Sequence, residues 1–93
     1  MFVASVRVEL HLPHLHSLKE KRSILNRIKD RMRNVGAAVA EVDHHELWQR
    51  AALGMALVAG EADALGGRIN ALRDIVSRQH DVQLLDWIES HHE

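Results

Sequence analysis

Basic side chains are concentrated in one segment of the chain, residues 17–34. This segment carries seven of the twelve lysine and arginine residues, against two acids, Glu20 and Asp30. Lysine and arginine neutralise backbone phosphates through contacts that are independent of base sequence and that weaken with salt. Four of these cations share one side of a helix drawn through the segment: Lys19, Arg22, Lys29 and Arg33. The segment predicts a nucleic-acid contact, with a merely solvated helix face as the alternative.

Three further residues bear on this prediction. Trp48 and Arg50 follow a polar stretch, residues 43–49, that we interpret as a loop or hairpin. There Trp48 could stack on a base and Arg50 could add a cation, whereas the alternative is a tryptophan that closes one end of the core. For Lys21 we expect the alkyl stem to cover apolar surface while the ammonium group reaches water.

Histidines suggest metal chemistry. The chain has eight, and five of them lie around Pro13 or in the loop expected at residues 43–49: His11, His14, His16, His44 and His45. Imidazoles brought together in one loop are good metal ligands, but this spacing matches no closed site. We therefore expect no metal, and a metal-dependent enzyme is the weakest hypothesis. His91 and His92 are expected to form a polar tail.

Other catalytic chemistry finds little support in the sequence. The chain contains no cysteine, threonine or tyrosine, no glycine-rich phosphate loop and no carboxylate pair at a recognised catalytic spacing. The absence of cysteine excludes disulfides, thiol catalysis and cysteine-based metal clusters. We expect a protein that is not an enzyme and needs no cofactor.

Hydrophobic periodicity divides the chain into six elements. Apolar residues alternate in residues 2–12 and 50–59, which predicts two strands with one buried face. Residues 37–42 are too few for a helix and predict another strand. Apolar residues recur at helical spacing in residues 17–34 and 61–80, and residues 82–89 predict a last strand.

Three local signals refine these elements. Ser17 and Glu20 form a capping-box pattern at the start of the first helix, and Gly36 supplies the left-handed residue that ends it. The paired glycines 66–67 in the second helix indicate either a close backbone contact or a soft first turn. For the last strand we expect Leu85 and Trp87 to face the core.

The order β-α-β-β-α-β predicts an α+β, ferredoxin-like sandwich, in which two helices cover one face of a four-stranded antiparallel sheet. The uncovered face lacks the aromatic residues on which RNA-recognition motifs stack bases. It offers small and apolar residues that favour close packing against a second copy. The predicted dimer interface consists of Val3, Ser5, Ala52, Gly54, Ala56 and Val58.

Two segments are the most specific parts of the sequence: Ser-Leu-Lys-Glu-Lys-Arg at 17–22 and Leu-Trp-Gln-Arg at 47–50. Together with the opening strand and Ala-Glu-Val-Asp at 40–43, they resemble the YlxP-like family of small bacterial proteins of unknown function. The resemblance spans nearly the whole chain. It implies a ferredoxin-like fold, no assigned activity and a loose association with genes for transcription and translation factors. His44 and His45 depart from the small or acidic residues expected in that loop.

Length and charge bound the remaining expectations. The 93 residues predict a single domain, 1–93, and the net charge of −1 conceals a segment of +5 at residues 17–34. No long apolar run or export signal is present, so we expect a cytoplasmic protein without membrane contact. We predict a non-catalytic, self-associating protein that binds structured RNA, with ribosomal RNA as the candidate. The alternative is a regulatory or scaffolding module that binds a protein partner or small ligand at its dimer interface.

Overall fold

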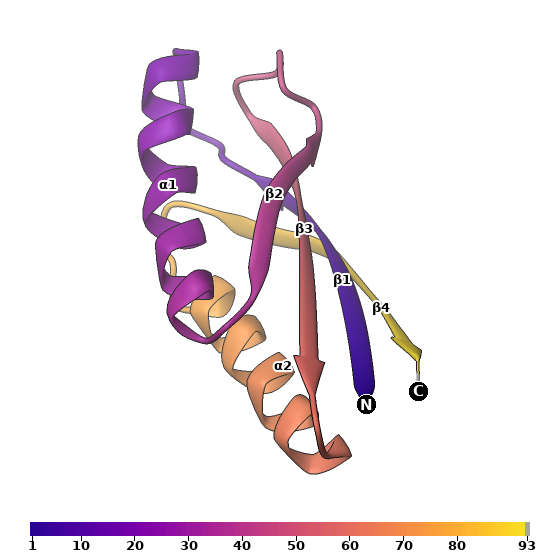
Figure 1. Ribbon diagram of the computed structural model, residues 1–93. Helices are drawn as coiled ribbons and strands as arrows, with labels where there is room; N and C mark the ends of the chain where they lie inside the picture. The colour runs from indigo at the N-terminus through magenta and orange to yellow at the C-terminus, as the bar shows by residue number, and fades with distance from the viewer. Residues whose placement is uncertain (93) are drawn as a thin grey trace.

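A computed structural model describes residues 1–92 and gives six elements in the predicted order. Glu93, the last residue of the predicted 1–93 domain, lies outside the described residues. The elements are β1 (Phe2–His11), α1 (Leu18–Asn34), β2 (Ala38–Asp43), β3 (Arg50–Ala59), α2 (Ala62–Ser77) and β4 (Gln83–His92). The strands form one antiparallel sheet in the order β2-β3-β1-β4. Both helices cover the same face (Figure 1), which confirms the predicted ferredoxin-like α+β fold.

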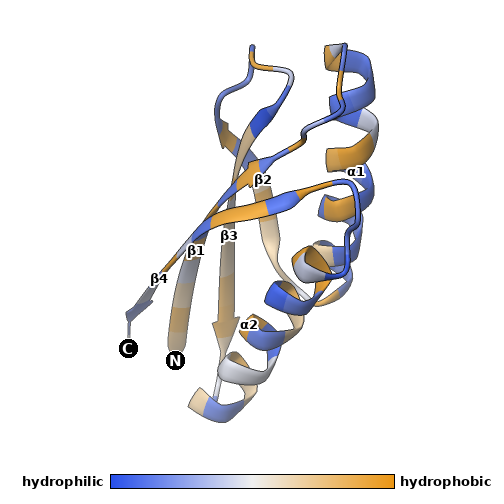
Figure 2. Cartoon of the chain, turned by 180° about the vertical axis from the view of Figure 1, so that it is seen from behind, coloured by the Kyte–Doolittle hydropathy of each residue, from blue (hydrophilic) through white to orange (hydrophobic). Residues whose placement is uncertain are grey.

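The core lies between the helices and the covered face of the sheet. Alternate residues of β1 and β3 supply the sheet side, because side chains of a strand point to opposite faces in turn. On α1 the apolar residues lie on the side toward the sheet and the hydrophilic residues on the outer side (Figure 2). The buried apolar residues of the helices are Leu25, Ile28, Met32, Leu65, Ile69, Leu72 and Val76.

Helix α1 begins and ends as the sequence predicts. The Ser17 hydroxyl accepts a hydrogen bond from the Glu20 backbone N–H at 3.2 Å, which caps one of the free donors of the first turn. After the helix, Gly36 has a φ of +99°, a conformation that glycine adopts without steric cost. The first residue of α1 is therefore set by this cap.

Strand β4 differs from its prediction in two ways. It runs to His92, and His91 and His92 pair with β1, so the prediction of a polar tail is wrong. A bulge separates Leu84 from Asp86 in the pairing with β1, so Leu84 and Trp87 both pack against the core. Leu85, predicted to face inward, is exposed because it is the extra residue at the bulge.

Helix α2 is shorter than predicted, since Glu61 and Arg78 flank it as caps rather than lying within it. The structure also answers the question of its paired glycines. A Cβ added at Gly66 or Gly67 would meet nothing within 4 Å, so no close backbone contact requires glycine at either position.

Candidate functional site

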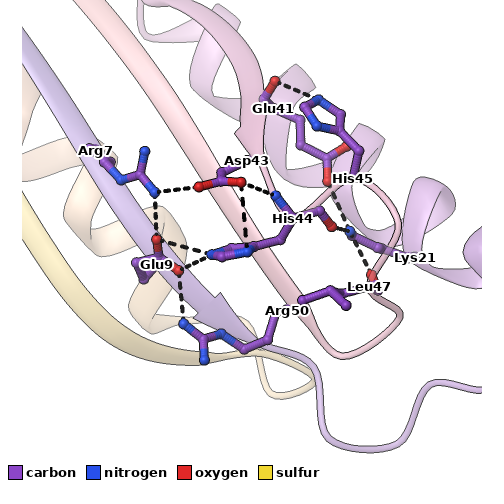
Figure 3. Close-up of polar contacts among 9 residues, drawn as sticks. All are labelled: Arg7, Glu9, Lys21, Glu41, Asp43, His44, His45, Leu47 and Arg50. Atoms are coloured by element: carbon purple, nitrogen blue, oxygen red, sulfur yellow. Dashed lines mark hydrogen bonds and ion pairs between the residues drawn. The ribbon is translucent and has the colours of Figure 1, made fainter.

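Lys21 is fully enclosed at the end of the molecule where α1 meets the loop between β2 and β3. Its residue is 1% exposed, and its ammonium nitrogen Nζ lies 2.6 Å from the His44 carbonyl oxygen and 2.7 Å from that of Leu47. It also forms an ion pair with Glu41, with Nζ and Oε2 2.9 Å apart (Figure 3). Two carbonyl oxygens thus accept hydrogen bonds from the ammonium group, and the Glu41 carboxylate balances its charge. The expectation that the head of Lys21 reaches water is therefore wrong.

The position of Lys21 explains its burial. It lies four residues before Leu25 and seven before Ile28, so it continues the buried stripe of α1 toward the loop. The position of this lysine in line with the apolar stripe was a sequence signal that it is buried. Its partners Glu41, His44 and Leu47 could not be identified in this way, because they are about twenty or more residues away in the sequence.

The contact of Lys21 brings together the two most specific segments of the sequence. Its partner Leu47 begins the second of those segments, and the Gln49 side chain also reaches the connection before α1, 3.4 Å from the carbonyl oxygens of Pro13 and Leu15. Residues 17–22 and 47–50 thus form one end of the molecule (Figure 1). We call residues 44–49 the hairpin loop.

The hairpin loop exposes two large apolar side chains. Leu47 and Trp48 are each 49% exposed. Trp48 therefore does not close the core, so the alternative role considered for it is wrong. The loop is shaped by His44, whose φ of 62° is unusual for a residue other than glycine, and by a hydrogen bond from the Leu47 N–H to the His44 carbonyl at 3.1 Å.

A network of charged side chains joins the hairpin loop to the uncovered face of the sheet. Glu9 accepts hydrogen bonds from Arg7 at 2.8 Å and from Arg50 at 3.0 Å, and its carboxylate lies 3.1 Å from His44 Nε2. Arg7 also reaches Asp43 at 3.3 Å (Figure 3). Arg50, predicted as a cation for nucleic acid, thus has a carboxylate partner within the protein.

The network lowers the pKa values of both of its carboxylates. Burial alone would raise the pKa of Glu9, but the hydrogen bonds from Arg7 and Arg50 outweigh it and hold that pKa below its usual range. A hydrogen bond from the His44 backbone N–H, followed by that from Arg7, lowers the pKa of Asp43. Both carboxylates are therefore anchored as anions beside the loop.

The predicted phosphate-binding residues lie together on one side of α1. We call Lys19, Arg22, Lys29 and Arg33 the cationic flank. Lys19, Arg22 and Arg33 are exposed and Lys29 is half-buried. Arg33 pairs with Asp30 at 3.1 Å, whereas Lys19, Arg22 and Lys29 form no ion pair within residues 1–92.

The charge of α1 is partly compensated by other parts of the chain. Lys21 pairs with Glu41 of β2, and Arg27 pairs with Asp81 at 2.7 Å. Acids outside residues 17–34 therefore oppose part of the charge of this segment, in addition to Glu20 and Asp30 within it. Because Arg27 points toward the turn before β4, the compensation leaves the cationic flank unaffected.

The predicted dimer residues lie on the uncovered face, where the structure shows a shallow groove of about 560 Å³. Ser5, Ala56 and Val58 are exposed there, and Val3 is half-buried. Ala52, however, is 0% exposed, since it lies between Glu9 and Asp43 on the neighbouring strands. It is not available to a partner.

Gly54 lies in the groove beneath the side chain of Val42. A Cβ at Gly54 would come within 2.8 Å of Val42 Cγ1, so Gly54 permits this close packing. Val42 and Ile88 also line the groove and are about half exposed, although neither belongs to the predicted interface. The prediction that Trp87 faces the core already implied that Ile88 lies on the uncovered face, but the predicted interface took residues from β1 and β3 alone.

The histidines lie in separate contacts. His11 lies 3.0 Å from the Gln83 side chain, His44 contacts Glu9, and His45 lies 3.1 Å from the Glu41 carbonyl oxygen. In the described part of the chain, no three histidine, aspartate or glutamate side chains gather in a way that could hold a metal ion. Neither helix of residues 1–92 has the length and apolar character needed to cross a bilayer.

Comparison with known proteins places the chain in a family. Over 44 residues it is 41% identical to the uncharacterized protein YlxP of Bacillus subtilis (strain 168), a match covering 46% of this chain and 48% of that protein. A solved amidase of the hydantoinase/carbamoylase family from Burkholderia phymatum superposes with a TM-score of 0.57 at 13% identity, over 96% of this chain and 28% of that one. That likeness concerns the fold alone. Residues 3–88 match the family described as "Protein of unknown function (DUF503)", and the chain belongs to this family.

Proposed function

We propose that this protein is a non-catalytic binding protein that contacts structured RNA through the cationic flank and the hairpin loop. The observation that carries the proposal is the set of three uncompensated cations, Lys19, Arg22 and Lys29, along one side of α1. From Lys19 to Arg33 the flank is about 20 Å long, enough to follow several backbone phosphates.

The hairpin loop extends this surface. It lies against the first turns of α1 through Lys21, so the half-exposed Trp48 is presented at the same end as Lys19 and Arg22. An exposed tryptophan can stack on an unpaired base whatever its identity. Phosphate contacts from the flank and one stacking contact together suit an RNA that has both a helical stem and unpaired bases.

The proposal is tested by comparing two triple variants for binding to a synthetic RNA stem-loop. In the flank variant, Lys19, Arg22 and Lys29 are replaced by Ser. In the control variant, Arg31, Arg73 and Arg78, three exposed arginines outside the flank, are replaced by Ser. Both lose three charges, so only a local contact makes the flank variant bind more weakly. Equal affinities of the two variants would contradict the proposal.

A second surface supports self-association, for which we propose the uncovered face of the sheet. Three strands of ten residues and one of six give this face an area of about 600 Å², approaching the ~800 Å² per partner of a stable interface. Its groove has a floor of small residues between Val42 on β2 and Ile88 on β4. Two copies packed face to face could each place these side chains over the small residues of the other.

The groove also favours the alternative function, a regulatory or scaffolding module that holds a protein partner or small ligand where two copies meet. An apolar groove with a few polar groups, here Ser5, Arg7 and Ser90, is typical of binding sites.

RNA binding implies residence where RNA is abundant, so we propose a cytoplasmic location and ribosomal RNA as the first candidate.

A further inference from the structure

We propose that Lys21 is a positioning residue, which holds the hairpin loop in the conformation that presents Trp48 to RNA. The inference rests on the proposed function for its RNA partner, but the positioning itself can be measured without RNA. It assigns a role to a charged residue that no phosphate can reach, since Lys21 is 1% exposed.

The ammonium group of Lys21 contacts both the hairpin loop and β2. It donates hydrogen bonds to two backbone carbonyls of the loop, from His44 and Leu47, and forms an ion pair with the Glu41 carboxylate of β2. The two carbonyls lie at either end of the turn that the Leu47 N–H closes onto the His44 carbonyl. One cation therefore fixes both ends of the turn that immediately precedes Trp48.

Other contacts restrain the two ends of the hairpin loop. At its start, His44 Nε2 lies 3.1 Å from the Glu9 carboxylate and His45 Nε2 lies 3.1 Å from the Glu41 carbonyl oxygen. Leu47 and Trp48 are both half exposed, so packing of their side chains does not hold the loop in place. Beyond the turn, the Leu12 N–H donates to the Gln49 carbonyl at 3.0 Å, and the Gln49 side chain makes two contacts at 3.4 Å. These contacts hold the residue after Trp48, and Lys21 holds the Leu47 carbonyl immediately before it.

A positioned Trp48 also binds a partner at a lower entropic cost. A side chain that is already held in its bound conformation loses less conformational entropy when a partner binds. An exposed tryptophan on a flexible loop would lose this conformational entropy each time a partner binds. Lys21 thus contributes to RNA affinity through Trp48, whereas Lys29, also a lysine of α1, contributes through a phosphate.

The test compares Lys21→Met with Lys29→Met in a Trp87→Phe background, where Trp48 is the only tryptophan. Without RNA, Lys21→Met is expected to raise the quenching of Trp48 by acrylamide and to lower its fluorescence anisotropy. Lys29→Met should change neither. Unchanged Trp48 signals in a folded Lys21→Met protein would overturn the positioning role, whatever the protein binds.

The RNA measurement uses the same stem-loop and a double-mutant cycle with Trp48→Ala. Trp48→Ala and Lys21→Met are each expected to weaken binding about tenfold, but Lys21→Met should add less than about twofold when Trp48 is absent. Lys29→Met should weaken binding equally with or without Trp48. Additive losses for Lys21→Met and Trp48→Ala would overturn the inference.

One outcome separates the inference from the proposed function. If Lys21→Met loosens Trp48 but the parent binds no RNA, the positioning role is supported and the RNA proposal fails. If Lys21→Met does not fold, Lys21→Gln, whose uncharged side chain is one bond shorter and keeps a donor, replaces it in both measurements. Circular dichroism establishes folding for each variant before comparison.

Discussion

At the scale of single residues, Glu9 connects the uncovered sheet face with the hairpin loop. Its carboxylate accepts from Arg7 and Arg50 and lies beside His44, although the Glu9 side chain is only 15% exposed. A carboxylate stabilised in this way has a lowered pKa, and its contribution to stability is present only while it is charged.

Replacing Glu9 by Gln should therefore lower the free energy of unfolding by about 1 kcal/mol near neutral pH. Because the pKa is lowered on folding, this contribution is complete above the unfolded value of about 4.3 and is lost as the pH falls through the folded value. Denaturant titrations of both proteins at a series of pH values should show the difference closing below about pH 4. A difference in stability that persists unchanged in acid would contradict the role of the charge. The control is Glu46→Gln, which removes an exposed carboxylate of the hairpin loop.

Residue roles were only partly predictable from the sequence. Periodicity identified which side of α1 is buried, and it also placed the cationic flank on one side of the helix. The partners of Lys21 and Arg50 were not predictable, because Glu41 and Glu9 are far away from them in the sequence. Charged side chains are judged from sequence as exposed, and only tertiary contacts reveal the exceptions.

At the scale of elements, the two helices differ in how their glycines are used. Gly36 ends α1 with a positive φ, whereas Gly66 and Gly67 lie inside α2 with open space where a side chain would be. Glycine inside a helix costs up to about 1 kcal/mol relative to alanine, mainly through backbone entropy.

Gly66→Ala and Gly67→Ala should therefore each raise the free energy of unfolding, by about 0.5–1 kcal/mol. Gly36→Ala should lower it, since alanine is strained at φ +99° and its Cβ would lie 3.0 Å from Arg68 Nη1. Thermal unfolding followed by circular dichroism gives the sign of each change. Destabilisation by both α2 substitutions would mean that the helix is packed more tightly than the structure shows.

Element boundaries were predictable where a local signal marks them. Ser17 and Gly36 mark α1, and β3 matches its predicted range of 50–59. The bulge in β4 has no such signal, because the sequence of that strand permits either face to turn inward. The register of β4 is set by its pairing with β1, and this pairing extends as far as His92.

At the scale of the whole molecule, the helices and the uncovered sheet face lie on opposite sides, so RNA and a second copy would bind to separate surfaces. Ala56 is exposed in the centre of that face, opposite Ser5 on β1 and Ala38 on β2. A charged side chain there would be buried without a partner if two copies packed face to face. The free energy needed to bury it would exceed what an interface of this size contributes.

Ala56→Glu should therefore give a folded monomer, while the parent and Asn70→Glu, which adds the same charge on α2, remain dimeric. Sedimentation of all three proteins over a range of concentrations distinguishes these states. Ala56 is preferable to Gly54 for this test, because a side chain at Gly54 would collide with Val42 and disturb the fold itself. A parent that is monomeric at the highest concentration would exclude the interface.

The central claim is that α1 binds RNA through charge, and the salt dependence of RNA affinity tests it most directly. Three uncompensated cations on the flank predict that the logarithm of the association constant falls with the logarithm of salt concentration with a slope of about −2 to −3. Replacing Lys19, Arg22 and Lys29 by Ser should bring this slope close to zero, whereas the control change of Arg31, Arg73 and Arg78 should leave it near the parent value. No binding by the parent at about 50 mM salt, or one slope shared by all three proteins, would contradict the account.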